Sequence, residues 1–422
     1  MTAARRSARR EPVVRTEFAV VGGGITGLSA AWALARRGRE VRVLEQAAIG
    51  HRAGGSHGAC RIFRLGYDDP GYVYLAARAG RLWDELEEAR GERLLHPTPQ
   101  LTFGPQMQQV RAAMTEAGAA CEVLRAAEAM ARFPGVNVTG EVLVEPASAV
   151  IAADRALTAL AALACPPGGI MAGTRVTSLA DDGRRVLVGT VAGDVEARRV
   201  LVCAGPWTAR LLAAGGITVP GSATLEQLAY LAPAAAAEPG SAASASAVPA
   251  GRAAVGQHSG MPIFVHYGGE FAYGLPVPGS DRYKVGIHHG GPPVDPDRQD
   301  HAGDPALGRR IERAARTFLP GFDPHPVQVE RCVYDNSPDT DFIVDRIGNV
   351  VIGSGTSGHG FKFGPLLGEW LAALASDAAG QRHRRGAPPP SGAIPGNQDR
   401  FGLGRFSAGS PARSGGRPAD SA

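Results

Sequence analysis

The period of the apolar positions changes twice in residues 18–45. A short β-branched run at 18–21 is followed by glycines, then by an alanine-rich stretch that stays apolar to Ala35, and residues 41–44 form a second short run. Short β-branched runs bounded by glycine are typical of strands, whereas long apolar stretches are typical of buried helices. The pattern therefore predicts a strand, a glycine turn, a helix that ends at Gly38, and a second strand.

Three later segments extend this pattern. Residues 200–203 read as a strand, and residues 350–355 read as a strand that leads through glycine-rich turns into a helix beginning near Pro365. An amphipathic helix is predicted after residue 64 because one face carries Leu75, Ala79, Leu82, Trp83 and Leu86. Alternating strands and helices favour an α/β fold.

Composition narrows the class of protein. The chain has 422 residues, 44% of them apolar and 20% charged, which suits two domains or one large composite fold. Its net charge of +4 is carried largely by arginines near the two ends, so we expect no nucleic-acid partner. The five cysteines are odd in number and lack C-x-x-C pairs, so we expect no disulfide framework, no metal site and a cytoplasmic location.

The apolar stretch at 18–35 raises the question of a membrane span or a signal peptide. It contains several glycines and is followed at once by Arg36 and Arg37. A spanning helix needs about 20 apolar residues, and a cleavable signal ends in small residues at a cut site. We therefore expect neither.

The glycine turn has the spacing of a dinucleotide site. Gly22, Gly24 and Gly27 form G-x-G-x-x-G between the first strand and the helix, a geometry that brings backbone N–H groups to a pyrophosphate. Glu45 ends the next strand, where a carboxylate accepts hydrogen bonds from ribose hydroxyls. The motif predicts dinucleotide binding but does not choose between FAD and NAD.

Only two of the 44 basic side chains are lysines, Lys284 and Lys362. A lysine ammonium is compact and shifts its pKa when desolvated, whereas a guanidinium is wide and permanently charged. The two lysines are therefore candidate site residues. The alternative is a GC-rich genome that replaced most lysine codons by arginine.

Several motifs together resemble the monomeric sarcosine oxidase family, which includes N-methyltryptophan oxidase and pipecolate oxidase. The resemblance runs over about residues 16–378 and is carried by H-G-A-C-R-I-F-R at 57–64, Y-G-L-P at 273–276, K-V-G-I-H at 284–288, R-C-V-Y at 331–334 and S-G-H-G-F-K-F at 357–363. It implies a Rossmann-like FAD-binding domain and a second, substrate domain built on a mixed, mostly antiparallel sheet.

The resemblance implies a cofactor role for several residues. It implies FAD attached through the sulfur of Cys332, with His57 and Arg61 assisting the attachment, and Gly205 and Gly358 close to the cofactor. A thiolate is the nucleophile that such a bond needs, and nearby cations favour it. Because His57 and Arg61 are four residues apart, we expect them on one side of a short helical turn.

The resemblance also implies roles toward substrate and oxygen. Arg64 and Lys362 would hold the substrate carboxylate, and Lys284 would activate dioxygen, because a fixed ammonium stabilises the small anion superoxide. His288, Tyr273 and Tyr334 would face the substrate. In a strand, His288 lies on the same face as Lys284, and we expect His289 to point the other way.

The domain prediction follows the same resemblance. We expect a discontinuous FAD-binding domain at 16–90, 150–222 and 335–378 and a substrate domain at 91–149 and 223–334. We expect a low-complexity insertion at 232–260 and disordered tails at 1–15 and 379–422, although residues 401–406 have the composition to dock. Ala59 and Cys60 replace an aspartate and a threonine common in the family.

The predicted reaction is oxidation of a secondary, N-methylated amino acid by hydride transfer to FAD, with O2 as acceptor and hydrogen peroxide as product, in a monomer. One alternative is an FAD-dependent dehydrogenase or oxidase of a cyclic imino acid in biosynthesis. A second is a catalytically silent flavin-binding protein, suggested by Ala59 and Cys60. A third, suggested by the glycine motif alone, is an NAD dehydrogenase.

Overall fold

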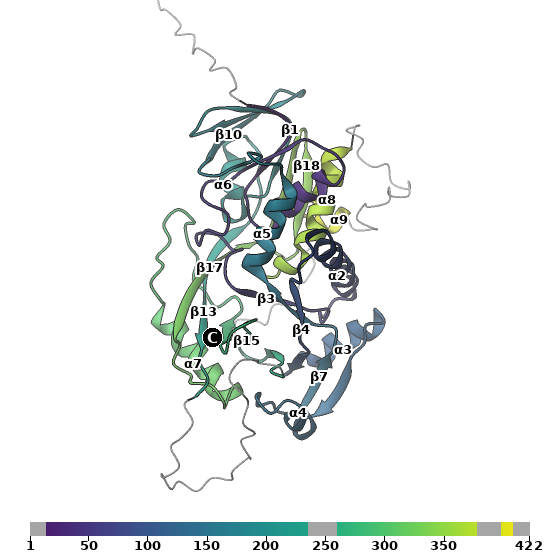
Figure 1. Ribbon diagram of the computed structural model, residues 1–422, viewed down its shortest axis with the longest axis vertical. Helices are drawn as coiled ribbons and strands as arrows, with labels where there is room; N and C mark the ends of the chain where they lie inside the picture. The colour runs from purple at the N-terminus through teal and green to yellow at the C-terminus, as the bar shows by residue number, and fades with distance from the viewer. Residues whose placement is uncertain (1–13, 235–259, 378–397, 408–422) are drawn as a thin grey trace, which may run out of the picture. The chain divides into compact units, whose positions relative to one another are not determined.

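The computed structural model describes residues 14–234, 260–377 and 398–407, and the rest of the chain, including most of the predicted insertion and tails, lies outside this description. The chain forms two compact units (Figure 1). Of the described residues, the first unit comprises 14–57, Leu157–Ala223, 333–377 and 398–407, and the second comprises Gly58–Ala156, 224–234 and 260–332. The sequence prediction instead placed residues 58–90 and 150–156 with the FAD-binding segments.

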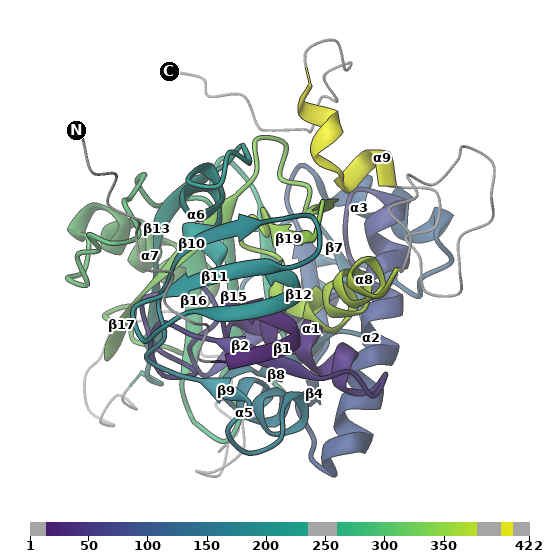
Figure 2. The same ribbon diagram turned by 90° about the horizontal axis from the view of Figure 1, so that it is seen from above.

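The first unit is built on a mixed sheet with parallel strands at its centre. The strand order is β10-β11-β12-β1-β2-β9, and β19 pairs with both β12 and β18. The strands are β1 (Val14–Val21), β2 (Val41–Leu44), β9 (Ile170–Met171), β10 (Val176–Asp181), β11 (Val186–Thr190), β12 (Val195–Val202), β18 (Ile343–Ile347) and β19 (Val350–Ser354). β1 lies parallel between β2 and β12, and Figure 2 shows this central group of strands. The strands predicted at 18–21, 41–44, 200–203 and 350–355 are confirmed, and β1 and β12 begin earlier than predicted, at Val14 and Val195.

Two buried helices of the first unit pack closely against each other, α1 (Ile25–Ala35) and α8 (Gly364–Ser376) (Figure 2). A side chain at Gly368 would meet the backbone of Ser29 at 2.4 Å, and one at Gly364 would meet Ile25 at the same distance. The glycines therefore set how closely the helices approach. The helix predicted near Pro365 is confirmed.

A short piece of the predicted C-terminal tail is folded against the first unit. It contains α9 (Gln398–Phe401) and η3 (Leu403–Phe406). Arg400 pairs with Asp341, Arg405 pairs with Asp339, and the fully buried Phe401 ring lies 5.4 Å from that of Trp370. Residues 401–406, which had the composition to dock, do so, and residues 398–400 are folded with them instead of disordered, because two ion pairs and one aromatic anchor hold this segment.

The second unit contains two sheets. The larger has the order β17-β13-β16-β15-β14-β5-β7-β6 and the smaller the order β3-β8-β4. Its strands are β3 (Cys60–Phe63), β4 (Leu95–Pro97), β5 (Gln100–Phe103), β6 (Glu122–Arg125), β7 (Glu141–Glu145), β8 (Ala149–Ala152), β13 (Ser222–Leu231), β14 (Ile263–Tyr267), β15 (Phe271–Pro276), β16 (Tyr283–Ile287) and β17 (Gln328–Asn336). Neighbouring strands such as β15 and β16 or β5 and β7 pair antiparallel, whereas β5 and β14 pair parallel. This agrees with the predicted mixed, mostly antiparallel sheet.

The remaining helices complete the two units. They are α2 (Pro70–Arg90), α3 (Met107–Glu116), α4 (Ala126–Arg132), α5 (Ala153–Ala164), α6 (Thr208–Ala213) and α7 (Pro305–Phe318), with 3-10 turns η1 (Gly205–Trp207) and η2 (Phe361–Phe363). The amphipathic helix predicted after residue 64 is α2, which buries Ala79, Leu82, Trp83 and Leu86 and half-buries Leu75. Across the described ranges, no helix combines the length and apolar character needed to cross a bilayer.

The larger sheet of the second unit has two different faces. On one side of the sheet, β16 contributes Tyr283, Val285 and Ile287 to a core. This core also includes Leu307 and Ile311 of α7 and Leu319 just after it, and we call this side the core face. Lys284 lies between Tyr283 and Val285 in sequence, and its side chain points to the opposite side because strand residues alternate. We call that side the cation face.

Candidate active site

The predicted glycine turn adopts a conformation that only glycine tolerates. Gly22 has φ of +104°, and a side chain there would lie 2.3 Å from the Cys203 carbonyl oxygen. A side chain at Gly27 would lie 1.9 Å from the Gly22 carbonyl oxygen, so strand and helix touch at this point. Gly24 is the N-cap of α1, and its neighbour Ile25 donates its N–H to Ser56 Oγ at 3.0 Å.

Glu45 lies at the end of β2, beside this turn, and is buried. Its carboxylate accepts N–H groups from Gly23 at 2.7 Å and Ala47 at 2.8 Å, and His51 Nε2 lies 3.2 Å away. Burial raises the pKa of Glu45, but these hydrogen bonds outweigh it and the net pKa is lowered. A carboxylate accepts about four hydrogen bonds, so one position remains for a ribose hydroxyl. The turn, the helix N-terminus and this acid fit the adenosine diphosphate part of FAD.

Lys284 is 1% exposed on the cation face. Its ammonium donates to the Cys60 carbonyl oxygen at 2.9 Å, and Arg61 Nη1 donates to the same oxygen at 2.9 Å. Among the described residues, the ammonium has no other hydrogen-bond partner and no carboxylate within 4.0 Å. Two of its three N–H groups therefore remain available to a ligand.

The electrostatics of Lys284 follow from this enclosure. Its pKa is lowered to about 8, first by burial and then by the like charge of Arg61, while Cys60, Glu330 and Cys332 act in the opposite direction. The ammonium is thus close to losing its proton at physiological pH. A group so perturbed, with a named charge partner, is typical of a functional site.

Cys332 lies on β17 next to this pair of cations. Arg61 Nη2 is 4.0 Å from Cys332 Sγ. Burial raises the pKa of the thiol, against the lowering by Arg61 and Lys284. The neighbouring Arg331 contacts other atoms instead, since its guanidinium donates to the carbonyls of Ala302 and Leu225.

The helical turn predicted for residues 57–61 is wrong. His57 lies in a loop, where Nδ1 is 3.1 Å from the Gly54 carbonyl oxygen, and Arg61 lies in the extended strand β3. Antiparallel pairing of Arg61 with Ile151 of β8 overrides the helical spacing. Spacing alone did not reveal this long-range pairing.

Arg64 follows β3 and is 8% exposed. Its Nη1 donates to the Gly66 carbonyl and, at 2.9 Å, to the Tyr267 hydroxyl, and its guanidinium carbon lies 4.5 Å from the centre of the Tyr67 ring. Among the described residues, Nε and Nη2 have no hydrogen-bond partner and the side chain has no salt bridge. The Glu145 carboxylate acts on Arg64 only through space, and a buried guanidinium without a direct ion pair suits an external anion.

The first unit carries two of the predicted substrate residues, Lys362 and Tyr334. Lys362 lies in η2, 6% exposed, and donates to the His359 carbonyl oxygen at 3.1 Å. Gly358 has φ of +75°, and a side chain there would lie 2.1 Å from the Tyr334 ring. The Tyr334 ring thus packs on the loop that carries Lys362. Gly205, at the start of η1, also has a positive φ, +53°.

The arrangement of the two histidines differs from the prediction. Regular strand β16 ends at Ile287, and His289 has a positive φ of +53°. The rings of His288 and His289 therefore lie 4.1 Å apart instead of pointing to opposite sides. His288 also contacts the Phe271 ring edge-on at 4.8 Å, and the Tyr273 ring covers Gly286. Within the described ranges, no three metal-binding side chains gather.

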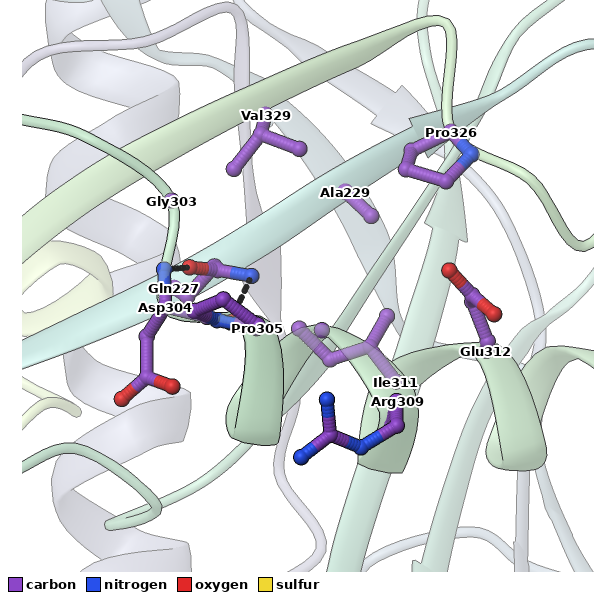
Figure 3. Close-up of a pocket in the computed structure, with 11 residues that line it drawn as sticks. Gln227, Ala229, Gly303, Asp304, Pro305, Arg309, Ile311, Glu312, Pro326 and Val329 are labelled. Atoms are coloured by element: carbon purple, nitrogen blue, oxygen red, sulfur yellow. Dashed lines mark hydrogen bonds between the residues drawn. The ribbon is translucent and has the colours of Figure 1, made fainter.

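A cavity of about 340 Å³ lies on the core face of the second unit (Figure 3). Gln227 and Ala229 of β13, Val329 of β17 and α7 line it, and the Gln227 side chain exchanges hydrogen bonds with the Asp304 backbone. None of the residues predicted from sequence lines this cavity. The buried charged residues, and not this cavity, therefore define the candidate site.

Sequence reasoning missed three residues of the second unit. Glu330 and Tyr230 lie beside Lys284 and Arg61, and the buried Glu145 carboxylate accepts the Gly66 N–H at 2.9 Å and so fixes the loop after Arg64. One signal was available for Glu330, because it stands two residues before Cys332 and strand residues two apart share a face.

Comparisons with known proteins agree with this geometry. Residues 17–374 match the family model "FAD dependent oxidoreductase". The chain is 33% identical over 372 residues to peroxisomal sarcosine oxidase of Mus musculus, covering 84% of this chain and 91% of that protein. It is 30% identical over 382 residues to N-methyl-L-tryptophan oxidase of Yersinia pestis, covering 86% and 95%. The solved structure of NikD, an amino acid oxidase essential for nikkomycin biosynthesis, aligns with a TM-score of 0.74 at 26% identity, covering 87% and 95%. The chain belongs to the FAD dependent oxidoreductase family and is similar within it to sarcosine oxidase and N-methyl-L-tryptophan oxidase.

Proposed function

We propose that this protein oxidises a secondary amino acid, N-methylated or otherwise N-substituted, with FAD as cofactor and O2 as electron acceptor. FAD, when bound, accepts a hydride from the substrate carbon and passes the two electrons to O2, which yields hydrogen peroxide. The substrate loses one C–H and one N–H hydrogen and becomes an imine, which water hydrolyses. The observation that carries the proposal is the pair of buried, incompletely bonded cations Arg64 and Lys284.

Arg64 is assigned the substrate carboxylate. Its free Nε and Nη2 edge matches the two oxygens of a carboxylate, and the ring of Tyr67 and the hydroxyl of Tyr267 keep the guanidinium in place. Lys362 is the second cation proposed for this carboxylate, with Tyr334, Tyr273 and His288 as side chains facing the substrate. Orienting an acid in this way converts binding energy into positioning.

Lys284 is assigned to dioxygen. A fixed ammonium in a dry site stabilises the negative charge that O2 gains with its first electron. Because only one of its N–H groups is used by the protein, the ammonium does not have to break an ion pair to do so. Cys60 supplies this single contact through its backbone, so replacing a threonine side chain at this position leaves the contact intact.

Cys332 is proposed as the covalent anchor of FAD, with Arg61 at 4.0 Å favouring its thiolate. His57, Gly205, Gly358, Glu45 and the three turn glycines complete the cofactor residues that we propose. We further propose that the first unit binds FAD, that the second forms the substrate pocket, and that the protein acts as a cytoplasmic monomer.

Peroxide release tests the substrate class. Purified protein is incubated with sarcosine, N-methyltryptophan, pipecolate and glycine, and peroxide is measured for each. Preference for a secondary amine over glycine supports the proposal; bound flavin that no amine reduces would identify a silent flavin protein. Preference for pipecolate would favour the second candidate, an oxidase of cyclic imino acids in biosynthesis, which the similarity to NikD motivates.

Arg64→Gln tests the clamp. It should raise KM by about tenfold to a hundredfold for an acidic substrate, since a charged hydrogen-bonded contact is worth about 1.5–3 kcal/mol. Arg331→Gln is the matched control, because the guanidinium of that buried arginine donates to the backbone carbonyls of Ala302 and Leu225. Equal rises of KM in both variants would contradict the assignment of Arg64.

Denaturing electrophoresis tests the covalent link. A fluorescent band under ultraviolet light in the wild type, absent in Cys332→Ser and present in Cys203→Ser, is the expected result. A wild-type band without fluorescence, from protein purified with ample flavin, would remove the link.

A further inference from the structure

Three neighbouring strands of the second unit place an acid, a tyrosine and a lysine in one row on the cation face. Tyr230 of β13 stands directly opposite Lys284 of β16 in the strand register, and the centre of its ring is 5.8 Å from the Lys284 ammonium. The Tyr230 hydroxyl donates to Glu330 Oε2 of β17 at 2.9 Å. The carboxylate and the ammonium therefore lie on two sides of one tyrosine.

Glu330 is 9% exposed, and its hydrogen bonds come from neutral donors. Besides Tyr230, Gln328 Nε2 donates to Oε1 at 3.0 Å. Among the described residues, no cation lies within 4.0 Å of this carboxylate. Burying an unpaired charge is costly, so an acid at this position needs an explanation beyond packing.

The charges around Lys284 provide that explanation. The titratable or charged groups that face the ammonium are Arg61 and Cys60 from β3, Tyr230 from β13, and Glu330 and Cys332 from β17. Arg61 and Lys284 share the Cys60 carbonyl, so two like charges are held together. Glu330 is the one carboxylate in this set, whereas Asp154 of α5 and Glu226 of β13 act on the neighbouring thiols Cys60 and Cys332. A Cβ atom added to Gly58 would lie 3.2 Å from Glu330 Oε2 and 3.3 Å from Arg61 Nη1. Both groups border the same point, so the Glu330 carboxylate also comes close to Arg61.

We propose that Glu330 is a positioning residue of the Lys284 centre: its carboxylate holds the Tyr230 ring beside the ammonium and supplies the negative charge that keeps Lys284 protonated next to Arg61. The inference rests on the proposed oxygen role of Lys284. It adds to that role a residue that does not touch the ammonium and acts through Tyr230 and through space.

Glu330→Gln tests the proposal because it keeps the size of the side chain and removes the charge. Substrate-reduced holoenzyme is mixed with O2 over a range of pH, and the rate of flavin reoxidation is recorded. The expected result is a pH midpoint about one unit lower than in the wild type, with the rate at low pH retained. Glu330→Asp, which keeps the charge, should return the midpoint toward the wild-type value.

Glu226→Gln is the matched control. Glu226, on β13, is buried like Glu330 and also carries a carboxylate. It binds the Thr224 hydroxyl and the Gly291 N–H instead of Tyr230. The pH midpoint of flavin reoxidation in Glu226→Gln should equal that of the wild type. A merely structural role for Glu330 would lower the reoxidation rate at every pH without moving the midpoint, and this result would overturn the proposal.

A second readout does not depend on activity. Melting temperatures are compared for Glu330→Gln in the wild-type and Lys284→Met backgrounds of the purified holoenzyme, in the absence of substrate. The loss should be larger when Lys284 is present, because the carboxylate then balances a buried charge. Equal losses would overturn the inference. A different result would contradict the proposed oxygen role of Lys284, namely a Lys284→Met variant that is reoxidised as fast as the wild type. Because the inference rests on that role, this result would overturn the inference too.

Discussion

The two faces of the larger sheet in the second unit are built from adjacent residues of the same strands but differ in kind. Ala229, Val329 and Tyr283 point to the core face, whereas their neighbours Tyr230, Glu330 and Lys284 point to the cation face. The core face contacts α7 through apolar side chains and leaves a cavity of about 340 Å³ (Figure 3). The cation face carries the buried Lys284 and Glu330, and the half-buried Arg61 of β3 lies beside them. A side-chain period of two thus lets one sheet support packing on one side and charge chemistry on the other.

Lys284→Met is expected to have the largest effect on the cation face. Flavin reoxidation by O2 should slow by about 10²–10³, the usual loss on removal of a preorganised charge stabiliser, while anaerobic reduction by substrate changes much less. Stopped-flow absorbance measures both steps. Tyr283→Phe is the adjacent control: it removes a hydrogen bond to the Pro262 carbonyl on the core face and should leave the O2 step unchanged. Equal loss in the reductive and oxidative steps of Lys284→Met would contradict the comparison.

Ile311→Ala tests the core face. Ile311 is 1% exposed and borders the cavity, so truncation should cost about 2–5 kcal/mol of unfolding free energy. The rate of reoxidation in the folded fraction should stay at the wild-type value. Denaturant titration measures the unfolding free energy, and stopped-flow absorbance on the same sample measures the rate of flavin reoxidation. A strong loss of reoxidation with little loss of stability would show that the two faces are not separate in function.

Lys284→Met should also stabilise the protein near neutral pH. In the folded protein the Lys284 pKa of about 8 lies below the ordinary value of 10.5. Above pH 10.5 the amine is neutral in both the folded and unfolded states and burial costs nothing, whereas stability falls as the pH drops toward 8 because only the unfolded state takes up the proton readily. At pH 7 the buried ammonium costs on the order of 3 kcal/mol, which the substitution removes in part. Melting temperatures of variant and wild type should therefore differ most at pH 7 and converge near pH 10. A difference that does not change with pH would argue against a desolvated ammonium.

Glu312→Gln at the rim of the cavity should have the smallest effect. Its side chain is 29% exposed and its contacts to Arg316 and His325 are long, at 3.8 Å and 4.0 Å. Stability should change by less than about 0.5 kcal/mol and kcat/KM should not change. A large loss of activity here would instead make the cavity part of the catalytic site.

The sequence allowed the local elements of the first unit to be predicted because their signals are local. The turn at Gly22, the helix after it and the strand before Glu45 each follow from period, glycine and spacing. For Glu330 the one local signal is its spacing of two residues from Cys332, which does not show what the side chain contacts. Its role depends on β17 lying beside β13, and β13 beside β16, and Tyr230 of β13 is 100 residues from Glu330 in the sequence.

Two other differences have causes that the sequence pattern does not reveal. His289 takes a positive φ, which non-glycine residues rarely do, and this turns its ring toward His288. Arg61 has a helical spacing from His57 but lies in β3, because pairing with β8 fixes the extended backbone. Tertiary context decided both, against the prediction from spacing alone.

The most direct test of the account is the pH dependence of flavin reoxidation in the wild type and in Lys284→Met, measured in air between about pH 6 and pH 10. The wild-type rate should fall as the pH rises, with a midpoint near 8 where the ammonium loses its proton, and the variant should be slow with no such midpoint. A wild-type rate independent of pH, or a variant that keeps the same midpoint, would contradict the assignment of Lys284 to dioxygen.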